Sequence, residues 1–99
     1  MSLPMIKVKI KFLSLLVDFI GNSELTLLLN VNSSIKDVFD KLLFDLPDKF
    51  ENIILTPQKT LNKFIILALN GSDIRSLNFL NIILKDGDII SFLPAIAGG

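Results

Sequence analysis

The stretch SIKDVFDKLLFDLP, residues 34–47, indicates the fold class because it is the clearest amphipathic helix in the sequence. Its apolar residues recur three and four positions apart, as a core-facing helix requires. They are Ile35, Val38, Phe39, Leu42, Leu43 and Leu46. Ser34 and Asp37 have the spacing of a capping box, and Pro47 is expected to end the helix.

The other side of this helix is polar. Lys36 with Asp40, and Asp37 with Lys41, are oppositely charged pairs spaced four residues apart. Phe44 falls on the same side. We expect its ring to tuck under the following loop, the alternative being that it belongs to a surface for a partner.

Two strands are predicted before the helix. Met5–Phe12 alternates apolar residues with lysines, the period of a strand with one buried face. We expect the lysine face to be solvated rather than a site for an acidic partner. Leu13–Ile20 is predicted to be a short helical or irregular crossover, ended by Gly21-Asn22. Glu24–Val31 then supplies a second strand paired with the first.

Further strands follow the helix. The segment 48–62 has weak periodicity and is predicted to be a loop, with at most a helical turn or a short edge strand near Ile53–Leu55. The apolar run Phe64–Leu69 has the composition of an interior strand, and Asn70-Gly71 supplies a turn that tolerates positive φ. Another short extended piece is expected within Ile74–Leu84.

The last strand is predicted at Ile89–Leu93, after a turn at Asp86-Gly87-Asp88. A calcium loop is an alternative for the two carboxylates, but the further oxygen ligands are not spaced for one. The element order predicts an α+β fold in which a mixed sheet packs on one main helix. We expect a single domain over residues 1–93 and a flexible C-terminal tail over residues 94–99.

Composition excludes several classes of function. Ten Lys plus Arg balance ten Asp plus Glu, so no net field favours nucleic acid or an acidic membrane. No apolar stretch is long enough to span a bilayer, and no signal peptide is visible, which predicts a cytoplasmic protein. An apolar content of 51% suggests either a patch covered by a partner or a rich core with scattered surface leucines.

The missing residue types also exclude most catalytic mechanisms. The chain has no Cys, His, Trp or Tyr, and therefore no thiol nucleophile, imidazole base or usual zinc ligand. It has no glycine-rich phosphate loop. We expect a protein that is not an enzyme on its own and that binds neither a metal nor a cofactor.

The tail Pro94-Ala95-Ile96-Ala97-Gly98-Gly99 has a composition suited to reaching another protein. Pro94 cannot donate to a sheet ladder, so the last strand is expected to end there. Fully extended, six residues span roughly 20 Å, and two glycines would pass a channel that rejects a Cβ atom. A frayed end or an artificial addition is the alternative.

The segment from Leu84 to Gly99 resembles the C-terminus of the MoaD/ThiS family of ubiquitin-like sulfur carriers. That family typically ends with a Leu, a D-G-D-type turn, an apolar strand, a proline and Gly-Gly. Asn70-Gly71 also looks like the family's mid-chain turn. Ala95 departs from the second proline that many molybdopterin-synthase small subunits carry there. The resemblance implies a ubiquitin-like β-grasp fold.

The resemblance also implies a reaction at Gly99. In such proteins a ubiquitin-activating-type adenylating enzyme uses ATP to convert the terminal carboxylate into an acyl adenylate, and a sulfur donor then yields a thiocarboxylate. If the MoaD branch applies, sulfur passes to a pterin precursor inside the larger molybdopterin synthase subunit. Pro94, Ile96, Ala97 and Gly98 would be the tail residues that enter the partner's channel.

Other functions share this activation step. A carrier for tRNA or thiazole thiolation would use the same tail, as would a ubiquitin-like modifier conjugated through Gly99. A plain interaction domain with a non-functional tail is a further alternative. For docking we expect apolar anchors beside the tail, at Ile96 and at Phe92 or Leu93. Because neighbouring strand residues alternate between faces, at most one of the latter two can be a contact.

Overall fold

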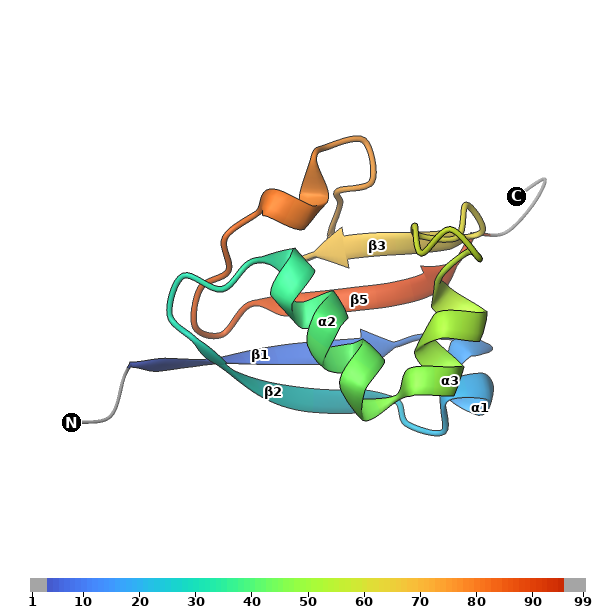
Figure 1. The fold of residues 1–99 in the computed structure, drawn as a ribbon, viewed down its shortest axis with the longest axis horizontal. Helices are drawn as coiled ribbons and strands as arrows, with labels where there is room; N and C mark the ends of the chain where they lie inside the picture. Colours follow the sequence, from blue (N-terminus) through green and yellow to red (C-terminus); the bar gives the residue numbers. More distant parts are fainter. Residues whose placement is uncertain (1–3, 96–99) are drawn as a thin grey trace.

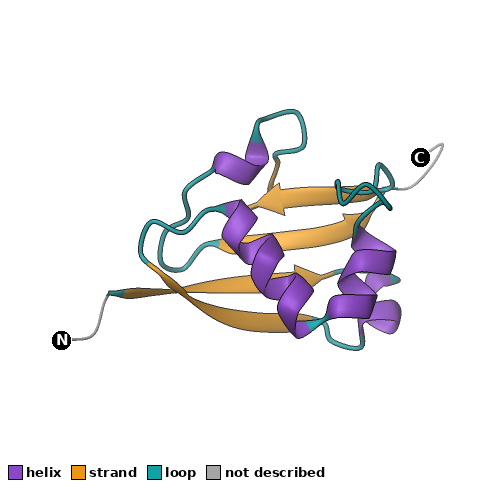
Figure 2. Cartoon of the chain, in the orientation of Figure 1, coloured by secondary structure: helices purple, strands orange, loops and turns teal. Residues whose placement is uncertain are grey.

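The structure is a computed structural model, and it describes residues 4–95. Five strands form one mixed sheet in the order β2-β1-β5-β3-β4, and helix α2 lies across one face of it (Figures 1 and 2). The strands are β1 (Met5–Phe12), β2 (Glu24–Asn30), β3 (Ile65–Leu69), β4 (Ser72–Asp73) and β5 (Ile89–Pro94). The helical segments are α1 (Leu16–Ile20), α2 (Ile35–Asp45), α3 (Pro47–Lys49), η1 (Phe50–Ile54) and η2 (Phe79–Asn81). The predicted α+β architecture is confirmed.

The first hairpin forms as its alternation predicts. β1 and β2 are antiparallel, and the side chains of Ile6, Val8, Ile10 and Phe12 are buried between the sheet and the helices. The crossover between them contains the short helix α1, which ends at Gly21 with a φ of 88°. A left-handed residue at this place favours glycine because it has no Cβ atom.

Helix α2 begins with the predicted capping box. The Ser34 side chain accepts from the Asp37 N–H, and the Asp37 carboxylate accepts from the Ser34 N–H at 2.8 Å. The Lys36–Asp40 pair is confirmed, with 2.9 Å between Nζ and Oδ2. Lys41 pairs with Asp45 instead of the expected Asp37, at 3.4 Å, since the Asp37 carboxylate is engaged at the cap.

Residues 47–54 differ from the predicted loop, because the chain continues helically through α3 and η1. Pro47 ends α2 but also opens α3 at a first-turn position, where its missing N–H costs nothing. Phe50 and Ile54 are four residues apart and fully buried, so tertiary burial holds this segment in helical form. No loop therefore passes over Phe44, whose side chain is 81% exposed, and the predicted burial of that ring is wrong.

The extended piece predicted within Ile74–Leu84 is also replaced by other structure. The short strand β4 lies earlier, directly after the Asn70-Gly71 turn, and Ile74–Leu84 holds the 3-10 turn η2. A single bridge joins Ile83 to Ser34. Ile74 and Leu84 are buried at the two ends of the segment, which crosses the surface between them.

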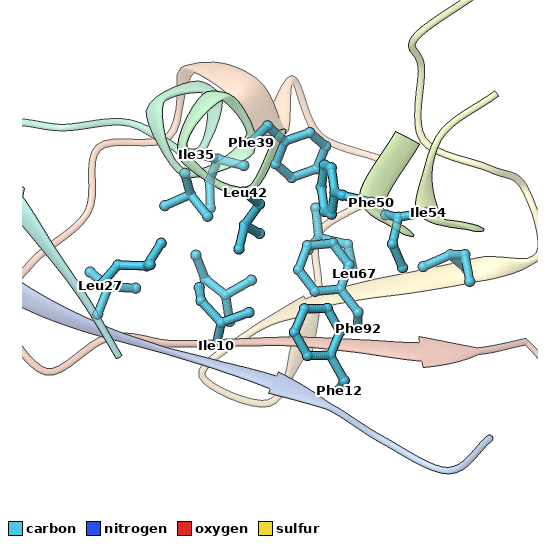
Figure 3. Packing of buried hydrophobic residues seen from close by; sticks show 14 of the residues in the cluster. Ile10, Phe12, Leu27, Ile35, Phe39, Leu42, Phe50, Ile54, Leu67 and Phe92 are labelled. Carbon is cyan, nitrogen blue, oxygen red and sulfur yellow. The ribbon is translucent and has the colours of Figure 1, made fainter. Parts of the chain in front are cut away.

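Aromatic rings fill the centre of the core between α2, η1 and the sheet (Figure 3). Phe12 and Phe92 stack with ring centroids 5.5 Å apart, and Phe50 meets Phe92 edge to face at 5.8 Å. Phe39 contacts both Phe50 and Phe92. Within residues 4–95, no helix is long and apolar enough to cross a membrane.

Candidate functional site

Strand β5, which leads to the tail, occupies the centre of the sheet. It runs parallel to β1, with Ile90 beside Ile10, and antiparallel to β3, with Leu93 beside Ile66. The Leu13 N–H donates to the Phe92 carbonyl at 3.0 Å, just beyond the end of β1. A strand bonded on both sides gives a rigid base for whatever follows it.

The predicted turn before β5 forms, and its carboxylates bind backbone groups. The Lys7 N–H donates to Asp86 Oδ1 at 2.8 Å, and the Gly87 N–H donates to the Lys7 carbonyl at 2.8 Å. Asp88 Oδ2 accepts from the Lys85 N–H at 2.7 Å. The Asp86 carboxylate therefore joins the turn to β1, and the Asp88 carboxylate stabilises the turn itself. Residues 4–95 hold no group of three or more acidic, Cys or His side chains placed to bind a metal ion.

Asn70 connects the two turns through its side chain, although they are far apart in the sequence. Its Nδ2 donates to Asp88 Oδ1 at 3.0 Å, and its Oδ1 accepts from the Ile89 N–H at 2.9 Å. The backbone of Asn70 is left-handed, with a φ of 51°. The Asn-Gly pair signals the turn, but nothing local signals a partner 18 residues away. Asn70 thus ties the β3–β4 turn to the first residue of β5.

Replacing Asn70 separates its two roles. We expect Asn70→Gly to lower the free energy of unfolding by about 1–2 kcal/mol, because the two side-chain hydrogen bonds are lost while the left-handed backbone remains easy to adopt. Asn70→Ala should cost about 1 kcal/mol more, since alanine is strained at this φ. Urea unfolding of both variants measures this, and equal stabilities would contradict the role of the backbone.

Phe92 and Leu93 point to opposite faces of the sheet. Phe92 is fully buried in the aromatic cluster, so its assignment as a docking residue is wrong, and the reason is its place on the face covered by the helices. Leu93 is partly exposed on the other face. Of this pair, Leu93 is the residue that a partner can reach.

The chain stays bonded to the sheet beyond Leu93, where the last strand was predicted to end. Pro94 is the last residue of β5 and lies beside Ile65, and the Ala95 N–H donates to the Phe64 carbonyl at 2.7 Å. A proline is tolerated at a strand end, where its missing N–H interrupts no further ladder. The strand therefore includes Pro94, which was placed in the tail. Ile96, Ala97, Gly98 and Gly99 lie outside the described residues.

Apolar side chains lie beside Pro94 and Ala95 on the outer face of the sheet, the face that the helices do not cover. Phe64, Ile66 and Leu93 form what we call the tail-base patch: Ile66 pairs with Leu93, and Phe64 bonds to Ala95 through its carbonyl. The Phe64 side chain is 58% exposed, with the Lys63 ammonium 5.2 Å from its ring centroid. Strand alternation places Phe64 and Ile66 on the same side of the run Phe64–Leu69, but only the packing of the helices on the opposite side shows that this side is the outer one.

Charged groups lie near this face in ordinary surface pairs. The Lys9 ammonium is 3.0 Å from Glu24 on the neighbouring strand. Elsewhere, hydrogen bonds from Arg75 lower the pKa of Asp73, and the Asp73 carboxylate raises the pKa of Arg75. A hydrogen bond to Asp40 similarly raises the pKa of Lys36. These three shifts belong to exposed ion pairs that are not on β5.

A mixed sheet packed on one main helix, with its last strand in the centre and followed by Gly-Gly, defines this chain as a ubiquitin-like β-grasp protein. The family model of the ThiS family matches residues 10–99. The chain therefore belongs to the ThiS family of small ubiquitin-like sulfur carriers and modifiers, as its C-terminal segment predicts.

Several solved structures share this fold. Small archaeal modifier protein 1 from Methanosarcina acetivorans is 32% identical, covering 97% of this chain and 99% of that chain at a TM-score of 0.73. SAMP1 from Haloferax volcanii is 19% identical, covering 94% and 99% at 0.78. A putative molybdopterin converting factor, subunit 1, from Pyrococcus furiosus is 20% identical, covering 92% and 99% at 0.70. A search of curated proteins found no match.

Proposed function

We propose that this protein carries sulfur as a thiocarboxylate on Gly99 and acts as the small subunit of a molybdopterin synthase. The observation that carries the proposal is the anchoring of the chain up to Ala95, through Pro94 beside Ile65 and the bond from Ala95 to Phe64. Four residues follow Ala95, and fully extended they span about 14 Å. That is enough for Gly99 to enter an active site while the sheet stays docked outside.

The proposed chemistry needs an activating partner. A C-terminal carboxyl group has an ordinary pKa near 3.5, so it is ionised at neutral pH and is a poor electrophile. A partner adenylating enzyme would join the Gly99 carboxylate to the α-phosphorus of ATP and release pyrophosphate. A sulfur nucleophile would then attack the carbonyl carbon and displace AMP. This chain would bind no cofactor itself and would supply the carboxylate, the reach and the docking surface.

The tail-base patch is the proposed docking surface. Phe64, Ile66 and Leu93 lie beside the point where the tail leaves the sheet, so a partner that takes the tail must approach them. Removing these apolar side chains from water would favour association. We include Ile96 in this surface because it is the first residue after Ala95.

One feature favours the molybdopterin branch. A crossover that contains α1 separates β1 from β2, which the resemblance links to MoaD-like proteins rather than to the shorter ThiS-type carriers. The fold itself is shared with the putative molybdopterin converting factor, subunit 1, of Pyrococcus furiosus and with SAMP1 of Haloferax volcanii, so it fits either function. A second candidate is a ubiquitin-like modifier conjugated through Gly99, and the 32% identity to a small archaeal modifier protein favours it.

Intact-mass analysis separates these functions. After incubation with a cognate adenylating enzyme, ATP and a sulfur donor, we expect the mass to rise by the exchange of one oxygen for sulfur. Adding the larger synthase subunit and a pterin precursor should return the original mass. Higher-mass conjugates in cell extract that depend on Gly99 would instead support the modifier. If the folded protein shows neither change, the proposal is wrong.

A further inference from the structure

Strand β2 forms a long free edge of the sheet. Among the described residues it pairs with β1 alone, over the seven residues Glu24–Asn30. The opposite edge is formed by β4, which has only two residues. A free strand edge exposes backbone N–H and carbonyl groups that can accept another strand.

The hydrogen bonds at the two ends of the β1–β2 ladder show which backbone groups face outward. The Phe12 N–H donates to the Ser23 carbonyl at 2.9 Å, and the Val31 N–H donates to the Pro4 carbonyl at 3.2 Å. Because bonding alternates along an antiparallel strand, the odd-numbered residues of β2 bond to β1. Glu24, Thr26, Leu28 and Asn30 therefore direct their N–H and carbonyl groups away from the sheet.

This edge lacks the features that usually prevent pairing. Natural edge strands are blunted by proline, lysine, bulges or shortness. The sequence of β2, ELTLLLN, has neither proline nor lysine, and its register with β1 is unbroken. Its single charge, on Glu24, is paired with Lys9. Leu28 is 57% exposed on the outer face of the sheet.

We propose that β2 pairs in antiparallel fashion with β2 of a second copy of this chain, about a two-fold axis at Leu27. In this register Thr26 lies opposite Leu28 of the other copy, and Glu24 lies opposite Asn30. All four are residues whose backbone groups face outward, so each pair exchanges two hydrogen bonds. The register uses all seven residues, and both sheets join into one.

The side chains suit this pairing on both faces. On the outer face no like charges lie opposite one another, and Leu28 of each copy is covered by Thr26 of the other copy. On the helix side, Leu25, Leu27 and Leu29 extend the apolar layer beneath α2. The lysines of the two β1 strands are three strand spacings apart, roughly 14 Å, so salt at physiological strength screens their repulsion.

The pairing leaves the tail free. β1 separates β2 from β5, so β5 and the tail-base patch stay away from the new contact. The proposed dimer is therefore independent of the proposed function. In the dimer, the two tails would extend from two separate β5 strands of one continuous sheet.

The first experiment measures association and locates it. Sedimentation equilibrium of the full chain from about 10 µM to about 1 mM covers the Kd range expected for a small interface. We expect a monomer–dimer equilibrium within that range. Amide hydrogen exchange of Thr26 and Leu28 should slow as concentration rises, while Leu25 and Leu27, already bonded to β1, should keep their protection. A protein that stays monomeric throughout overturns the proposal, as does a dimer in which Thr26 and Leu28 exchange unchanged.

A matched pair of variants tests the backbone contact. Thr26→Pro removes an outward N–H and leaves the β1–β2 ladder bonded, so we expect a folded protein whose dimer Kd rises about tenfold or more. Thr26→Ala keeps the N–H and should change the Kd by less than about threefold. Protection of Leu25 and Leu27 confirms that the proline variant is folded. If that folded variant associates as tightly as the unchanged protein, the edge is not the interface.

Discussion

Deleting Gly99 should lower the rate of adenylation by about 100-fold or more and leave the melting temperature unchanged. The deletion withdraws the carboxylate by one residue, roughly 3.5 Å, and a displacement of even 1 Å in a reacting group can cost a factor of 100. Stability should not change, because the last sheet contacts among the described residues, at Pro94 and Ala95, lie at least four residues before Gly99. ATP–pyrophosphate exchange with the cognate adenylating enzyme and a thermal melt measure the two effects.

Two further variants separate the position of the terminal carboxylate from the absence of a Cβ atom at Gly98. Appending one alanine after Gly99 should abolish adenylation as the deletion does, since the carboxylate is then displaced in the other direction. Gly98→Ala keeps the carboxylate in place and should slow the reaction only as far as the enzyme's channel rejects a Cβ atom. A fall in stability comparable to a core truncation, or normal adenylation without Gly99, would contradict this account of the tail.

Phe92→Ala should destabilise the fold by about 3–5 kcal/mol, the usual cost of truncating a buried phenylalanine. The Phe92 ring stacks on Phe12 and contacts Phe39 and Phe50, so its loss leaves a cavity among rings from three other elements. For a domain of this size the melting temperature should fall by at least about 12 °C. Calorimetry or urea unfolding measures the change.

Leu93→Ala is the matched control on the neighbouring residue. Its side chain is partly exposed on the outer face, so we expect a loss of less than about 1 kcal/mol in stability. Binding to the adenylating enzyme should weaken instead, because the variant removes part of the tail-base patch. The opposite result, a stable Phe92→Ala and an unstable Leu93→Ala, would mean that the two faces of β5 are assigned the wrong way round.

Local patterns in the sequence predicted most of the elements. The alternation of Met5–Phe12 and the stripe of apolar residues in 35–46 each lie within one element, as does the capping box at Ser34. The helical stretch after Pro47 escaped prediction because its periodicity is weak. It is held by the burial of Phe50 and Ile54 against parts of the chain far away in sequence.

The candidate site could be predicted only in part from the sequence. The turn at Asp86–Asp88 and the Gly-Gly ending can be recognised in a few residues, and they indicated the family. The link from Asn70 to Asp88 could not be predicted, because it joins two turns that approach only when β3 and β5 pair. The tail-base patch likewise needs Ile66 and Leu93 side by side.

The sequence by itself determined the α+β class and the positions of the main helix and strands, because caps, periodicity and turn residues act over short distances. Only the tertiary structure decided that Phe92 belongs to the core and Leu93 to the surface, and that the chain is anchored as far as Ala95. Alternation shows that two neighbouring strand residues face opposite ways, but the side on which the helix packs decides which of them is buried.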